Sequence, residues 1–500
     1  MTRLSTATLP ALPAAIRRPA YDRSALRPGI VHLGLGAFAR GHLAEYTEDA
    51  LEREFGEWGI IGASLQRPDQ RDRLKPQDGL YTLLKRSPAG PELRIIGSVR
   101  DVLVAPENPA ALIARLALAD TKIVSLTVTE KGYCHDPATG RLKAKHPDIV
   151  HDIANPLAPR SAVGIIVAGL KARRDAGLGP FTVLCCDNLP HNGNVLGGLV
   201  GDFAALSDDG LSQWIAANGA FPCTMVDRIV PATTEVDIAE VEGLLGLHDA
   251  APVIGEPFRQ WAIEDRFVAG RPAWDGVGAQ MVSEVAPFEF MKLRMLNGAH
   301  SSLAYLGYLA GHETVSQASN DPVFARFLQG LWGEIIPTVP APQGVALADY
   351  ASALLTRFQN PAIRHRTWQI AMDGSQKLPQ RLLGTIRDRL TAGAPIAHLA
   401  LGVAAWMRYV QGTDETGAAI DVKDPLAAEF ARRAAGAGRN ARALSTALLG
   451  IESIFGTDLP REERFTSAVE THLAMLFDKG AKATAAGLSL QGQARGTPLL

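Results

Sequence analysis

Short apolar runs alternate with segments of helical period over the first part of the chain. Residues 29–33 form a β-favouring run, residues 37–54 have the period of a helix, and residues 58–64 form a second apolar run. Further strand patterns lie at 94–98, 122–129 and 181–185, and helical patterns at 108–119 and 162–176. Strands that alternate with helices predict an α/β domain built on a parallel, doubly wound sheet.

The pattern changes at about residue 287. From there helical periodicity prevails, and the predicted helices cover 288–310, 321–332, 346–357, 378–392, 397–411, 425–434 and 442–454. We therefore predict two domains, residues 1–286 and a mostly α-helical domain at 287–500. The small and polar residues of 481–500 predict partial disorder.

Charge and cysteine content narrow the function classes. Fifty Lys and Arg against 52 Asp and Glu leave a net charge of −2, so neither nucleic acid nor a membrane is expected as a partner. The apolar runs 162–170 and 399–407 are shorter than the ~20 residues that cross a bilayer. Four cysteines without metal-ligand spacing suit a reducing, cytoplasmic setting. The sequence shows no heptad repeat and no obvious apolar edge that would indicate an interface between subunits, so a monomer or weak oligomer is expected.

A glycine-rich turn follows the first predicted strand. Gly34-Leu35-Gly36-Ala37-Phe38-Ala39 fits the dinucleotide fingerprint in its Gly/Ala form. The first glycine permits a tight turn, the second lets the backbone approach a pyrophosphate, and the small third residue lets the helix lie close to the strand. An ordinary strand–helix turn is the alternative.

An acidic residue after the second strand would favour NAD over NADP, because it can bind the ribose hydroxyls. Asp69 occupies such a place, although it comes later than usual. Arg67 and Arg71 flank it and could instead accept a 2′-phosphate. We expect NAD, with a solvated turn carboxylate as the alternative for Asp69.

Oxidation of an alcohol by a nicotinamide nucleotide requires a proton acceptor and a group that holds the oxyanion. No zinc-ligand pattern such as H-E-x-x-H is present. Tyr81 and Lys85 have the Tyr-x-x-x-Lys spacing but lie in a strand-like context, which separates the two side chains. In the loop after 181–185, Asn188 could face a substrate oxygen, although Asp-Asn and Asn-Gly pairs also favour turns.

Lys292, Asn297 and His300 offer a metal-free alternative. At about 100° per residue, Asn297 lies about 140° and His300 about 80° from Lys292 around an α-helix, so all three share one side. A lysine whose pKa is lowered towards ~7–8 can act as acid and base, and an asparagine can hold a developing alkoxide. A solvated polar helix face is the alternative.

Several motifs in order along the chain resemble one family. They are G-x-G-x-F-x-R-x-H at 34–42, T-E-K-G-Y at 129–133, C-D-N-L-P-x-N-G at 186–193, V-D-R-I-V-P at 226–231, E-P-F-x-Q-W-x-x-E-D-x-F at 256–267, K-x-x-x-x-N-x-x-H at 292–300 and D-G-S-Q-K-L-P at 373–379. Together they resemble the mannitol dehydrogenase family of long-chain polyol and hexuronate dehydrogenases, from about residue 30 to beyond residue 450.

The resemblance implies a Rossmann-type N-terminal domain, a mostly helical C-terminal domain and catalysis by lysine without a metal. It implies Lys292 as the catalytic base, Asn188 and Asn297 as the pair that binds the reacting oxygen, and His300 as the residue that orients substrate and lysine. The cofactor contacts that it implies are Gly34, Leu35, Gly36, Ala37, Phe38, Arg40, Asp69 and Glu130. Asp227 and Lys377 are implied as pocket residues.

Within the family, three stretches resemble the fructuronate reductase branch: 129–133, 292–296 and 364–372. Mannitol 2-dehydrogenases lack the equivalents of Lys131 and Arg294 and tend to carry an arginine where Gln369 stands. A sugar acid carries a carboxylate that needs a cation or several N–H donors when it is buried. We therefore expect Lys131, Arg294 and Arg366 to contact the substrate, surface ion pairs being the alternative. The implied reaction is the reversible NAD-dependent reduction of D-fructuronate to D-mannonate, and mannitol or another polyol or hexuronate is the alternative substrate. A non-catalytic NAD-binding protein is a distant third.

Overall fold

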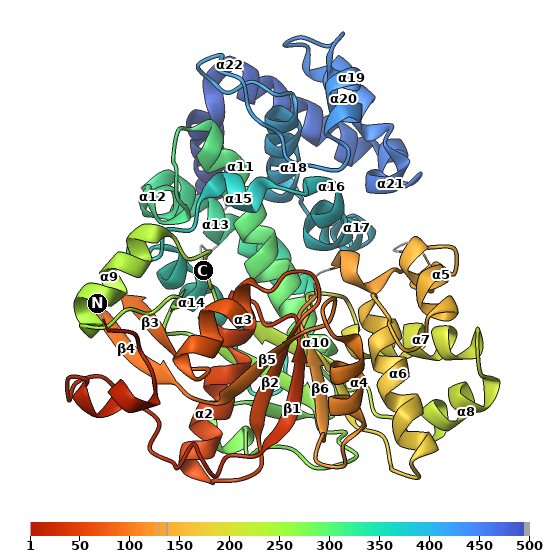
Figure 1. The fold of residues 1–500 in the computed structure, drawn as a ribbon. Helices are drawn as coiled ribbons and strands as arrows, with labels where there is room; N and C mark the ends of the chain where they lie inside the picture. Colours follow the sequence, from red (N-terminus) through yellow and green to blue (C-terminus); the bar gives the residue numbers. More distant parts are fainter. Residues whose placement is uncertain (1, 129, 137–138, 495–500) are drawn as a thin grey trace. The chain divides into compact units, whose positions relative to one another are not determined.

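The computed structural model describes residues 2–128, 130–136 and 139–494 (Figure 1). The side chains of 130, 131 and 489–494 lie outside the described part. The chain folds into two compact units, Met1–Ala286 (unit 1) and Pro287–Leu500 (unit 2).

A five-stranded sheet forms the centre of unit 1. Its strands are β1 (Pro28–Leu33), β2 (Gly59–Ser64), β5 (Val99–Val104), β6 (Ile123–Leu126) and β7 (Thr182–Cys185), in the order β5-β2-β1-β6-β7. Every neighbouring pair is parallel, which confirms the predicted parallel sheet. The carboxyl ends of β1, β6 and β7 therefore lie side by side, where a doubly wound sheet binds its ligands.

Both faces of this sheet are buried, because alternate residues of each strand enter different cores. Val31 and Val124 belong to a core that includes residues of α4 (Pro109–Ala117), α6 (Ala162–Asp175) and α7 (Asn192–Ala205). Ile30 and Ile123 belong to a core with α1 (Ala37–Gly41) and α2 (Leu43–Arg53). Burial on both faces explains why the strands read as unbroken apolar runs.

Unit 1 also contains two small sheets, and one of them shows that the strand predicted at 94–98 does not belong to the parallel sheet. One joins β3 (Tyr81–Ser87), β4 (Gly90–Ile96) and β9 (Val253–Gly255), and the other joins β8 (Thr224–Asp227), β10 (Gln260–Glu264) and β11 (Gln280–Val282). The run 94–98, predicted as a further strand of the parallel pattern, is partly in β4, which pairs antiparallel with β3. The missed edge strand is β5, whose Arg100 and Asp101 interrupt its apolar pattern.

The remaining helices of unit 1 are α3 (Asp69–Leu74), α5 (Pro147–Ala154), α8 (Asp209–Asn218) and α9 (Glu235–Leu245). The predicted helix over 37–54 is divided into α1 and α2 at His42, where φ is −130°. No helix among the described residues is both long and apolar enough to cross a membrane.

The described part of unit 2 contains helices and isolated bridges but no strand, as predicted. The helices are α10 (Ala286–Met291), α11 (Gly298–Leu309), α12 (Val315–Asn320), α13 (Pro322–Ile335), α14 (Leu347–Phe358), α15 (Thr367–Ala371), α16 (Gly374–Leu378), α17 (Gly384–Thr391), α18 (Ala397–Val410), α19 (Ala427–Ala434), α20 (Ala441–Leu449), α21 (Glu452–Phe455) and α22 (Glu463–Ala494).

Two predictions for unit 2 need correction, and a third is tested only in part. The helices expected at 288–310 and 378–392 are each interrupted by a π-helical turn, η5 (Lys292–Asn297) and η7 (Pro379–Leu383). Of the stretch 481–500, for which partial disorder is predicted, residues 495–500 lie outside the described part, and residues 481–494 continue α22 beyond a break at Gly480. Ala481, Ala485 and Leu488 are buried there, so their small and apolar side chains contribute to packing.

Candidate active site

The loop after β1 has the geometry that its glycines predict. Gly34 has φ of +85°, and a Cβ there would lie 2.3 Å from the Thr127 carbonyl oxygen. Gly36 is exposed and has an ordinary φ of −82°. A Cβ on Gly36 would meet nothing closer than the Gly34 carbonyl oxygen at 3.8 Å. Of these two glycines, the fold therefore requires only Gly34. The space beside Gly36 is open for a ligand.

The neighbouring side chains of the loop point mostly into the protein. Leu35 is buried against Gly62 of β2, and Phe38 stacks on His42 with ring centroids 5.1 Å apart. Arg40 is buried, donates to the Ala251 carbonyl oxygen at 2.5 Å and lies over the Tyr81 ring. Any cofactor contact of Leu35 or Arg40 would therefore come from the backbone. Ala37 begins α1.

A buried polar chain that the sequence did not reveal supports this loop. His32 Nδ1 lies 2.8 Å from Ser125 Oγ, and its Nε2 lies 3.0 Å from Thr127 Oγ1. Thr127 in turn donates to the Gly34 carbonyl oxygen at 2.9 Å. Burial lowers the pKa of His32 to about 4, so the imidazole is neutral. The turn is thus fixed to the ends of β1 and β6.

Asp69 is exposed in the first turn of α3, five residues beyond the end of β2. Arg71, the alternative partner for a 2′-phosphate, forms ion pairs with Asp72 at 2.8 Å and with Glu107. Asp69 has no described side-chain role in this network, and its carboxylate is exposed. Arg67 is exposed.

Asn188 is held at the carboxyl end of β7 by its neighbours. The Asp187 carboxylate accepts from the Val128 N–H at 2.9 Å and from the Tyr133 hydroxyl at 2.6 Å. Asn192 donates to the carbonyl oxygens of Cys185 and Thr224. These bonds fix the loop, and Asn188 itself is exposed at its tip.

Asp227, another predicted pocket residue, is buried as the last residue of β8. Glu130 and Lys131 belong to the short 3₁₀ turn Glu130–Tyr133, but their side chains lie outside the described part. Thr129, the first residue of the same motif, is also outside it.

In unit 2, Lys292 and Asn297 are the first and last residues of the π-helical turn η5. The angles expected for an α-helix therefore do not hold. A π-helix is closed by bonds from residue i to residue i+5, so Lys292 and Asn297 are about one turn apart on one side. Both are nearly buried. Trp332 Nε1 donates to the Met295 carbonyl oxygen at 2.9 Å and braces the turn.

His300, in the first turn of α11, is buried among rings. It stacks on Phe358 with ring centroids 5.0 Å apart, and it makes a T-shaped contact with His365, whose ring centroid is 4.8 Å away. Its Nε2 is buried without a hydrogen-bond partner. Burial, followed by the nearby charges of His365, Arg381, Arg357 and Lys377, lowers its pKa well below the ordinary value. The imidazole is therefore neutral.

The other predicted substrate residues of unit 2 differ in surroundings. Lys377 Nζ donates to the carbonyl oxygens of Ile370 and Met372 at 3.2 and 2.5 Å. Arg294 forms an ion pair with Asp388 at 2.5 Å and donates to the Thr338 carbonyl oxygen. Arg366 is exposed and precedes α15.

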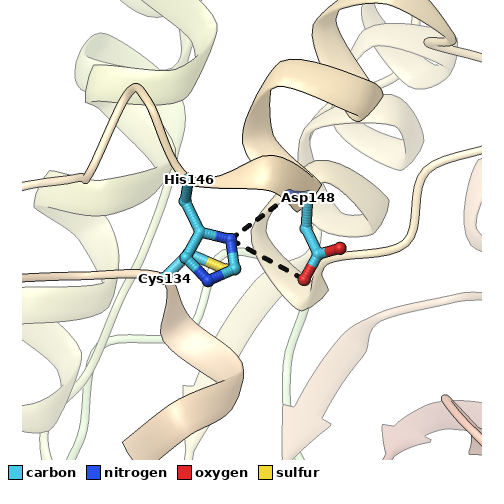
Figure 2. Close-up of side chains that lie close together, drawn as sticks. All are labelled: Cys134, His146 and Asp148. Atoms are coloured by element: carbon cyan, nitrogen blue, oxygen red, sulfur yellow. Dashed lines mark hydrogen bonds and ion pairs between the residues drawn. The ribbon is translucent and has the colours of Figure 1, made fainter.

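Two other chemistries would use a Tyr–Lys pair or a metal ion. Tyr81 and Lys85 lie in β3, where the Tyr81 hydroxyl donates to the Arg40 carbonyl oxygen and Lys85 pairs with Glu45, so that pair is structural. Among the described residues, one group could offer a metal three ligands: Cys134, His146 and Asp148 (Figure 2). Its His146 Nδ1 already accepts the Asp148 N–H at 3.2 Å as a helix cap.

Comparison with known proteins decides the family. A model described as "Mannitol dehydrogenase Rossmann domain" matches residues 28–276, and one described as "Mannitol dehydrogenase C-terminal domain" matches residues 284–477. The chain belongs to the mannitol dehydrogenase family. The predicted Rossmann-type and helical domains are confirmed, and so is an NAD-dependent oxidoreductase at the level of the family.

Similar proteins differ in substrate. D-mannonate oxidoreductase of Escherichia coli is 49% identical over 98% of this chain and 100% of its own length. Mannitol 2-dehydrogenase of Pyrenophora tritici-repentis is 41% identical over 93% of this chain and 82% of its own. The structure of Pseudomonas fluorescens mannitol 2-dehydrogenase with NAD and D-mannitol has a TM-score of 0.89 at 39% identity, covering 97% of this chain and 99% of that one.

Proposed function

We propose that this protein catalyses the reversible NAD-dependent reduction of D-fructuronate to D-mannonate. The observation that carries the proposal is the presence of Lys292, Asn297 and His300 on adjoining turns of one helix, in a chain that is similar over its whole length to a D-mannonate oxidoreductase. Mannitol 2-dehydrogenases are also similar, at lower identity. The small number of cysteines, four in 500 residues and all buried, supports a reducing compartment, the cytoplasm.

Unit 1 would hold the cofactor in this proposal. The open space beside Gly36 admits a pyrophosphate close to the backbone, and Asp69 would bind the adenosine ribose. When bound, NAD(H) supplies or accepts the hydride. The neutral His32 and the Thr127 hydroxyl keep the loop in place without adding a charge near the phosphates.

Lys292 would move the proton. In reduction its ammonium gives a proton to the ketone oxygen, and in oxidation the neutral amine takes a proton from the hydroxyl. The carboxamides of Asn188 and Asn297 would bind that oxygen and stabilise the charge that develops on it. Because His300 is neutral and held between Phe358 and His365, it can orient substrate and lysine by hydrogen bonding. The proposal requires no metal.

Rates of NADH oxidation with a panel of hexuronates and hexuloses test the proposal. We expect kcat/KM for D-fructuronate to exceed that for D-fructose at least 100-fold. Equal rates, or a preference for fructose, would favour mannitol 2-dehydrogenase, and a preference for tagaturonate would assign a different hexuronate. NADH binding without turnover of any member of the panel would indicate a non-catalytic protein.

A further inference from the structure

Two of the three cations predicted to bind a sugar-acid carboxylate, Arg294 and Arg366, have surroundings that do not suit a buried carboxylate, and the side chain of Lys131 lies outside the described part. Arg294 is committed to Asp388 and Thr338, and its guanidinium also lies 5.1 Å from the centre of the Phe290 ring. Arg366 is exposed beside α15. A carboxylate that leaves water needs a cation within a largely buried site, and unit 2 has further cations close to His300.

Arg381 lies next to the predicted catalytic helix. It belongs to the π-helical turn η7, and its Nη1 donates to Ser301 Oγ at 2.9 Å. Ser301 is fully buried and directly follows His300. A Cβ on Gly298 would lie 2.8 Å from the Arg381 carbonyl oxygen, so the backbone of η7 packs directly on the start of α11. Arg381 is thus fixed close to His300 by two separate contacts.

Three cations lie near His300. They are Arg381, Arg357 and Lys377, and each of them, after burial and the neighbouring His365, helps to lower the pKa of His300. Such a concentration of positive charge at a buried site stabilises an anion, and mannitol carries no charge that would make use of it.

We propose that Arg381 is the specificity residue that binds the carboxylate of the sugar acid, with Lys377 beside it, at the end of the substrate away from the ketone. Arg381 presents a planar guanidinium with five N–H donors, one of which is oriented by Ser301, and this geometry suits a carboxylate. The inference rests on the proposed function, since it assumes a sugar-acid substrate.

Kinetics of Arg381→Met and Arg381→Lys test this role, with Arg389→Met as the matched control. Arg389 lies eight residues further on and donates to the Pro395 carbonyl oxygen. Loss of a charged hydrogen bond should lower kcat/KM for D-fructuronate about 10- to 100-fold. The loss should appear mainly in KM, because the carboxylate is bound equally in ground and transition states. The rate with D-fructose should change less than twofold, and Arg381→Lys should recover part of the loss.

The outcomes separate this inference from the function itself. If the wild-type protein shows no preference for the acid, the proposed function fails. If it prefers the acid but Arg381→Met retains that preference, the assignment of Arg381 is wrong, and a loss in Arg294→Met instead would restore the first candidate. Should Arg381→Met not fold, as judged by melting temperature and NADH binding, an unchanged KM for fructuronate in Arg381→Lys would also overturn the assignment.

Discussion

Replacement of the two glycines of the β1 loop by alanine should affect different properties: Gly34→Ala should lower stability, and Gly36→Ala should weaken NADH binding. At Gly34, alanine must adopt φ of +85°, which costs about 1–2 kcal/mol. Its Cβ would also lie 2.3 Å from the Thr127 carbonyl oxygen, closer than such atoms approach. Since the ends of β1 and β6 would have to separate, we expect a total cost of about 3 kcal/mol. That is a fall in melting temperature of about 6–12 °C.

At Gly36 the fold tolerates alanine, because φ is −82° and the nearest atom to a Cβ is 3.8 Å away. We expect the stability of Gly36→Ala to lie within about 0.5 kcal/mol of wild type. The methyl group would occupy the space needed by the pyrophosphate, so the Kd for NADH should rise at least tenfold. Thermal unfolding and NADH fluorescence titration measure the two effects. Wild-type NADH affinity in Gly36→Ala would refute the placing of the phosphates at this loop.

Three further predictions concern acid, metal and cofactor choice. Burial lowers the pKa of His32 and of His472 to about 4, so each is neutral when folded and binds a proton more readily when unfolded. The free energy of unfolding should therefore be highest above pH 6.5 and should decrease towards pH 4 by about 3 kcal/mol for each histidine. Urea titrations at several pH values measure this, and His472→Leu should reduce the decrease. The same pH dependence of the free energy of unfolding in His472→Leu and in the wild type would contradict the prediction. Dialysis against EDTA should leave NADH oxidation unchanged, whereas a loss that Zn²⁺ restores, and that does not occur in Cys134→Ser, would assign a functional metal to the cluster in Figure 2. Asp69→Ala should lower the preference for NAD over NADP at least tenfold in kcat/KM ratios, and an unchanged ratio would place the ribose elsewhere.

Local pattern predicted the nucleotide loop well, because the requirement at Gly34 is set by its own turn and by the neighbouring strand end. The same holds for the parallel sheet, whose strands are buried on both faces and are therefore apolar throughout. Strand β5 was missed because its charged pair, Arg100 and Asp101, interrupts the apolar run at the edge of the sheet.

Contacts between distant residues could not be read from the sequence. Arg294 pairs with Asp388, which is separated from it by 94 positions in the sequence. Arg381 donates to Ser301, at a separation of 80 positions. Neither spacing carries a local signal. The π-helical turns also escaped prediction, because one additional residue per turn shifts the apolar pattern only slightly. That shift nevertheless brings Asn297 to about one turn from Lys292, instead of the ~140° expected for an α-helix.

The role of Lys292 is the central claim, and single-turnover reduction of D-fructuronate by Lys292→Ala, followed from pH 6 to pH 10, tests it most directly. We predict that the rate falls at least 100-fold at every pH, since general acid–base catalysis contributes ~10²–10⁴. NADH affinity and melting temperature should stay as in the wild type, and added small primary amines should restore part of the rate. Near-normal reduction across this pH range would contradict the claim.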